Sequence, residues 1–79
     1  MTNDHGLQVE VHDDEIIVSL PHTRFAVTYY KLRGTNDPQL YAKDFPLEGD
    51  PRSAMSQVEF MAHAWKLAND KARELEWRV

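Results

Sequence analysis

The sequence of 79 residues lacks cysteine and contains only three glycines. Without cysteine it has no disulfides, no zinc–thiolate sites and no thiol nucleophile, a composition that suits a reducing cytosol. Gly6, Gly34 and Gly49 are isolated from one another, so no glycine-rich loop is available to hold phosphate groups. These absences exclude thiol-dependent catalysis and phosphate-loop nucleotide binding.

Long apolar runs and clustered positive charge are also missing. No apolar run approaches the ~20 residues that span a bilayer, and the first ten residues lack the basic and apolar regions of a secretory signal. The formal net charge is −4, with nine Lys/Arg against 13 Asp/Glu, and the basic residues are scattered. Because nucleic acids are bound by clustered basic residues, we expect no nucleic-acid partner. The missing apolar run and secretory signal lead us to expect no membrane partner and a cytoplasmic location.

Alternating apolar residues in the first third of the chain predict three β-strands. A two-residue loop at Asp13–Asp14 and a four-residue loop at 21–24 place nine apolar side chains on one face of an antiparallel meander. A slip of one residue in either loop would turn one strand's apolar set to the other face, so the two loop lengths support each other. The nine residues are Leu7, Val9, Val11, Ile16, Val18, Leu20, Phe25, Val27 and Tyr29.

The rest of the chain divides into a turn-rich region and a helix. Residues 33–50 carry glycine, proline, asparagine and aspartate, and a short fourth strand at the sheet edge is predicted within 39–45. Residues 51–78 predict one long helix that starts at Asp50–Pro51, with Ser53 and the Ser56–Glu59 capping box as rival starts. Its apolar stripe, at steps of three and four, is Ala54, Val58, Met61, Trp65, Ala68, Ala72, Leu75 and Val79, with Ala64 beside it.

These elements predict a single α+β domain spanning residues 1–79. It consists of an N-terminal tail (1–6), a three-stranded antiparallel β-meander (7–32), a loop with an edge strand (33–50) and a C-terminal helix (51–78) packed on one face of the sheet. The sheet and the helix need each other, because each would otherwise expose a large apolar surface to water.

The predicted helix is longer than the sheet that it covers. A helix of ~25 residues is about 38 Å long, whereas a six-residue strand spans about 20 Å. The overhang is covered by residues 33–50 folding back or by a second copy of the protein, unless the last turns fray. Small residues at Ala64, Ala68 and Ala72 would allow two helices to approach closely in a homodimer. The residues predicted for self-association are Ala68, Ala72, Leu75, Trp77 and Val79.

Histidines and acids form the candidate chemical sites. The stretch His12–Glu15 lacks the twelve-residue oxygen pattern and central glycine of a calcium loop, so we interpret it as a polar hairpin turn. The strand register sets His5 opposite His22, where two imidazoles are the beginning of a transition-metal site but do not complete one. His63 lies one helical turn from Glu59, a spacing typical of a weak surface ion pair.

The sequence favours a small cytoplasmic protein-interaction module that forms a homodimer through its C-terminal helix, without catalytic activity, cofactor or metal. The alternative is a ligand- or metal-binding domain, or a small enzyme, that uses His5, His22 and neighbouring acidic residues. A third interpretation, single-stranded nucleic acid on the sheet, is disfavoured because Tyr29 and Tyr30 point to opposite faces. The face predicted for another protein partner consists of Ile17, Ala26, Thr28 and Tyr30.

Overall fold

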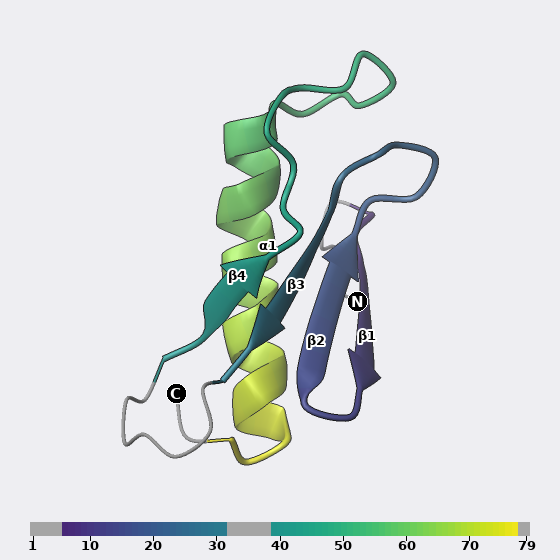
Figure 1. Ribbon diagram of the computed structural model, residues 1–79. Coiled ribbons are helices and arrows are strands. Elements are labelled where there is room, and N and C mark those ends of the chain that lie inside the picture. The colour runs from purple at the N-terminus through teal and green to yellow at the C-terminus, as the bar shows by residue number, and fades with distance from the viewer. Residues whose placement is uncertain (1–5, 32–38, 78–79) are drawn as a thin grey trace.

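In the part of the chain that the structure describes, four antiparallel strands form one sheet, and a helix covers one of its faces (Figure 1). The computed structural model of the protein describes residues 6–31 and 39–77. The strands follow one another in the order β1-β2-β3-β4, so the predicted α+β meander with a C-terminal helix is confirmed. The elements are β1 (Gln8–His12), β2 (Glu15–Ser19), β3 (Ala26–Tyr30), β4 (Tyr41–Lys43) and α1 (Gln57–Glu74).

The strand register agrees with the one that the loop lengths predict. Asp13 and Asp14 form a two-residue hairpin loop, and Asp13 has a φ of +54°. A positive φ at the first central position is a property of the mirror-image turns that match the twist of a hairpin. The Leu20 N–H donates to the Phe25 carbonyl at 3.0 Å, which continues the second hairpin beyond its strands. The inward pairs are Val9–Val18, Val11–Ile16, Ile16–Tyr29 and Val18–Val27.

The core lies between α1 and the inner face of the sheet. Six of the nine residues predicted to point inward are buried, whereas Val9 and Leu20 are half-buried and Val11 is exposed. The difference follows from position, since β1 is an edge strand and α1 packs chiefly against β2. The inner side of β1 is therefore only partly covered.

The helix stripe that faces the sheet coincides with the predicted one in part, since Ala64, Ala68 and Ala72 are buried as predicted. Val58 and Trp65, which we placed in the apolar stripe, are 72% and 44% exposed. Phe60 instead stacks on Phe25 with ring centroids 5.0 Å apart. The small alanines that follow it at intervals of four let the helix backbone approach the sheet closely. The buried helix residues are Phe60, Ala64, Ala68 and Ala72.

The helix begins at Gln57. The predicted start at Asp50–Pro51 is therefore wrong, and the rival start at the Ser56–Glu59 capping box is confirmed. The Ser56 hydroxyl accepts the Glu59 N–H at 3.1 Å, and the Glu59 carboxylate accepts the Ser56 N–H at 2.8 Å. This reciprocal capping box satisfies two N–H groups that the first helical turn leaves without partners.

The helix ends at Glu74, four residues before the predicted end. Glu76 has a φ of +66°, and its N–H donates to the Arg73 carbonyl at 2.9 Å. The Trp77 N–H donates to the Ala72 carbonyl at 2.7 Å, which completes a Schellman motif. With 18 residues α1 is about 27 Å long, so much of the predicted overhang disappears.

Candidate functional site

A pocket of about 460 Å³ lies between the β2–β3 loop, the segment that precedes α1 and the first turns of α1. Its volume falls in the range of small-molecule sites, which makes it the first place to look for ligand chemistry. The polar residues that line it are Thr23, Arg52, Ser53, Glu59 and His63.

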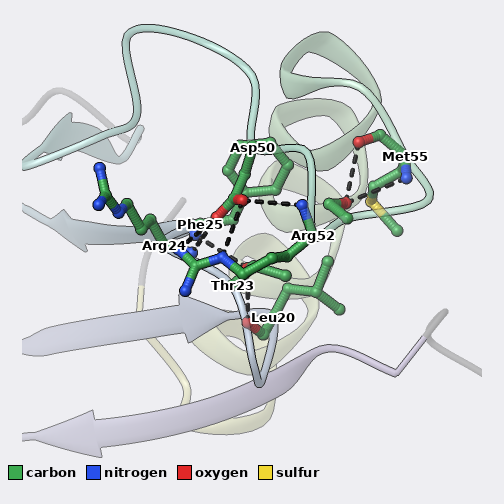
Figure 2. Close-up of polar contacts among 8 residues, drawn as sticks. Leu20, Thr23, Arg24, Phe25, Asp50, Arg52 and Met55 are labelled. Atoms are coloured by element: carbon green, nitrogen blue, oxygen red, sulfur yellow. Dashed lines mark hydrogen bonds and ion pairs between the residues drawn. The ribbon is translucent and has the colours of Figure 1, made fainter.

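Asp50 fastens the two loops beside this pocket to each other (Figure 2). Its buried carboxylate accepts the Arg24 N–H at 2.6 Å and the Arg52 N–H at 2.9 Å. The Arg52 guanidinium adds contacts at 3.1 and 3.0 Å. The hydrogen bonds from the Arg52 side chain, and then those from the two backbone N–H groups, hold the pKa of Asp50 well below its usual range. The Asp50 carboxylate therefore joins the two loops by hydrogen bonds, and Asp50 is not the helix N-cap that we predicted.

The hydroxyl groups of the pocket are already committed to the protein's own backbone. The Thr23 hydroxyl donates to the Leu20 carbonyl at 2.8 Å and accepts the Phe25 N–H at 3.0 Å. The Ser53 hydroxyl both donates to and accepts from the backbone of Met55, at 2.9 and 3.0 Å. A nucleophile requires a hydroxyl that is activated by an adjacent base, so these groups stabilise the loops and do not form a catalytic pair.

The predicted pairing of two histidines, His5 and His22, stays a prediction. His5 lies outside the described residues, and His22 is exposed in the β2–β3 loop with a φ of +69°. His12 is also exposed, with its Nε2 atom 3.1 Å from a carboxylate oxygen of Glu10. Within residues 6–31 and 39–77, no group of three or more histidine, aspartate or glutamate side chains is placed to hold a metal ion.

The residues predicted for self-association differ in how far they are buried within the single chain. Ala68 and Ala72 are fully buried against the sheet, so their surfaces are already in contact with the chain's own core. Trp77 is half-buried and packs on the same core, and Val79 lies outside the described residues. Leu75 is the exposed member of the predicted set.

The outer face of the sheet is covered by its own polar side chains. The Lys43 ammonium group lies 2.6 Å from the Glu15 carboxylate and 5.5 Å from the centre of the Tyr30 ring. The hydrogen bond to Glu15 is the main cause that raises the pKa of Lys43. Ile17 pairs with Thr28 across the strands as predicted. Of the four residues predicted for a partner, Thr28 is buried, and those half-buried are Ile17, Ala26 and Tyr30.

Four exposed apolar side chains belong to the N-terminal half of α1 and to the segment that follows β4. The sequence did not predict them as a group. Phe45 and Leu47 are 45% and 85% exposed, and the Gln57 side chain donates to the intervening Pro46 carbonyl at 3.0 Å. This bond holds the segment that follows β4 beside the N-terminal turn of α1 (Figure 1). We define the 45–65 patch as Phe45, Leu47, Val58 and Trp65.

The signal that identifies this patch is the spacing of the small residues on the helix. Val58 and Trp65 are seven residues apart and share one side of α1, about 90° away from the stripe that faces the sheet. A second row of apolar residues at intervals of four, from Phe60 to Ala72, could also face the sheet in place of Val58 and Trp65. A prediction that placed this row against the sheet would have left Val58 and Trp65 exposed, as they are in the structure.

Comparison with protein-family models, with curated proteins and with solved structures found no match to this chain. Across the residues that the structure describes, no helix is both long enough and apolar enough to cross a membrane.

Proposed function

We propose that the protein is a small cytoplasmic interaction module that associates with a second copy of itself through the 45–65 patch and has no catalytic activity of its own. The observation that supports this proposal is that four exposed apolar side chains belong to two segments joined by the hydrogen bond from Gln57 to Pro46. Exposed apolar side chains that cluster on a protein surface mark interaction sites. The absence of cysteine fits a cytoplasmic location.

The side of α1 that carries Val58 and Trp65 has the spacing of a helix–helix seam. Its positions i, i+3, i+4 and i+7 carry apolar residues, and an exposed alanine in the middle allows close approach of a second helix. Symmetric dimers are the commonest oligomers, and a chain of this size gains stability from association because its own core is small. The seam residues are Val58, Met61, Ala62 and Trp65.

Sedimentation velocity across the micromolar range tests this proposal. We expect a dimer at high micromolar concentration, and a monomer when Leu47→Lys is combined with Val58→Lys. These two positions are the most exposed of the patch, so the fold tolerates the change. Val11→Lys, an exposed apolar position on the far edge strand, is the matched control and should remain dimeric. A wild-type monomer at high micromolar concentration would contradict the proposal, as would a double variant that still dimerises.

A further inference from the structure

The free edge of β1 has the properties of a strand-binding site. β1 is the last strand of the sheet, so one row of its backbone N–H and C=O groups points away from β2 (Figure 1). Among the described residues, no strand pairs with this edge. Every residue of β1 except the half-buried Val9 is exposed. Within residues 6–31 and 39–77, this edge of β1 is therefore left without a partner strand.

A groove of about 320 Å³ lies beside this edge, between β1 and the C-terminal half of α1. Its apolar lining comes from Leu7, Val9 and Leu67, and its rim carries Lys71 with neighbouring acids. Val11, the next inward-facing residue of β1, is exposed. Because side chains alternate along a strand, a fifth strand beside β1 would place every second side chain over these apolar groups.

The outward-facing row of β1 consists of Gln8, Glu10 and His12 and carries one carboxylate. Glu10 lies in the middle of this row, exposed to solvent, and contacts His12 of the same strand. Asp13 and Asp14 add two exposed carboxylates at the adjoining turn. Opposite charges that face each other across strands are stabilising and like charges are destabilising. A lysine or arginine is therefore the favoured residue opposite Glu10 in an added strand.

A second copy of the chain fits this edge poorly. The antiparallel register that pairs all five residues of β1 with the same strand of a second copy sets Glu10 opposite Glu10. It also repeats the net negative charge of the chain on both sides of the contact. The charge pattern thus favours a different and basic partner.

We propose that β1 binds an extended segment of another protein as a fifth, antiparallel strand. The segment carries apolar residues at alternate positions toward the groove and a lysine or arginine opposite Glu10. Main-chain hydrogen bonds supply the affinity of such strand addition, and the alternate side chains supply its specificity. This site is separate from the 45–65 patch, because it uses the edge of the sheet at β1 and not the side of α1 that follows β4.

Two synthetic heptapeptides test the proposal by NMR titration, one of alternating lysine and valine and one of alternating glutamate and valine. The lysine–valine peptide should shift the amide signals of Gln8–His12 and Leu67. Glu10→Lys should weaken its binding by about fivefold to tenfold and strengthen binding of the glutamate–valine peptide. Glu48→Lys makes the same charge change in an exposed loop and should alter neither affinity by more than about twofold.

Two N-methylated versions of the lysine–valine peptide, methylated on the valines or on the lysines, separate strand pairing from charge attraction. One version should lose binding and the other should keep it, because alternate N–H groups of a strand point to opposite edges. Equal affinity of all three lysine–valine peptides would overturn the proposal, and so would equal effects of Glu10→Lys and Glu48→Lys. Failure of the wild-type protein to bind either parent peptide, or dissociation of its dimer by the lysine–valine peptide, would also overturn it.

Discussion

Among the residues that the structure describes, Tyr29 is the one whose buried side-chain polar group lacks a hydrogen-bond partner. Its side chain is 1% exposed, it packs edge-on against Trp65 with centroids 5.7 Å apart, and its hydroxyl makes no hydrogen bond with the described chain. An unsatisfied buried hydroxyl costs roughly 1–3 kcal/mol relative to its hydrated state. The aromatic ring stabilises the core while its hydroxyl opposes folding.

Replacing Tyr29 with phenylalanine should therefore stabilise the protein. We expect Tyr29→Phe to raise the free energy of unfolding at pH 7 by about 1 kcal/mol, because the ring packing is kept and the unpaired hydroxyl is removed. Urea denaturation measures the change. Tyr30→Phe, on the half-buried outer face, should change the same quantity little. A less stable Tyr29→Phe variant would show that the hydroxyl is satisfied in solution.

The same residue should make the protein sensitive to alkali. Burial raises the pKa of Tyr29 from 10.0 to about 12. Between these values the folded chain keeps a proton that the unfolded chain has released, so stability falls as pH rises through this interval. The interval corresponds to about 2.7 kcal/mol at most. The stability difference between Tyr29→Phe and wild type should therefore be larger at pH 11 than at pH 7, and an equal difference at both would contradict this assignment.

Asp50 should be the polar residue on which the loop arrangement depends most. We expect Asp50→Ala to lower the melting temperature by roughly 5–10 °C, because it leaves the Arg24 N–H and the Arg52 guanidinium without their acceptor. Asp50→Asn, which keeps one acceptor oxygen, should have a smaller effect. The depressed pKa of Asp50 stabilises the fold above the usual value of 3.8 and this contribution is lost as pH falls below it. Melting curves at pH 7 and pH 3 should show the wild-type advantage shrinking in acid.

At the scale of the elements, the C-terminal end of α1 offers a stabilising change. Glu76 occupies the left-handed position of the Schellman motif, where glycine has no steric penalty. Glu76→Gly should raise the free energy of unfolding by about 1 kcal/mol. Glu74→Gly, within the last helical turn, should lower it by a similar amount. Opposite signs for the two glycines in urea denaturation would establish the cap, and a destabilising Glu76→Gly would contradict it.

The strands were predictable from the sequence to a greater degree than the face of the helix. A strand has only two faces, so the two loop lengths were enough to assign the inward residues and their register. A helix offers several overlapping stripes. The predicted stripe contained the buried alanines but also Val58 and Trp65, which are exposed, and it omitted the buried Phe60. Close packing against a sheet selects small residues such as Ala64 and Ala68, a choice that depends on the distance between the layers. The exposed patch followed from that choice and was missed with it.

For the whole molecule, the two proposed surfaces lie on different parts of the fold. The 45–65 patch adjoins β4 and the N-terminal half of α1, whereas the strand-binding edge belongs to β1 and the groove beside the C-terminal half of α1. A dimer formed through the patch would leave two β1 edges accessible. Such a dimer would bind a partner with two suitable segments more tightly than either site alone, provided that the linker spans them.

Association through the 45–65 patch should make the stability of the fold depend on protein concentration. If the dimer forms through the 45–65 patch, association stabilises the folded chain by mass action, and the melting temperature should rise by a few degrees for roughly a hundredfold increase in protein concentration. The Leu47→Lys and Val58→Lys double variant should melt at one temperature at all concentrations, since it lacks the apolar groups that the second copy covers. Val11→Lys should keep the wild-type dependence. A concentration-independent wild-type melting temperature, measured by circular dichroism in cells of different path length, would show that the folded chain is stable as a monomer.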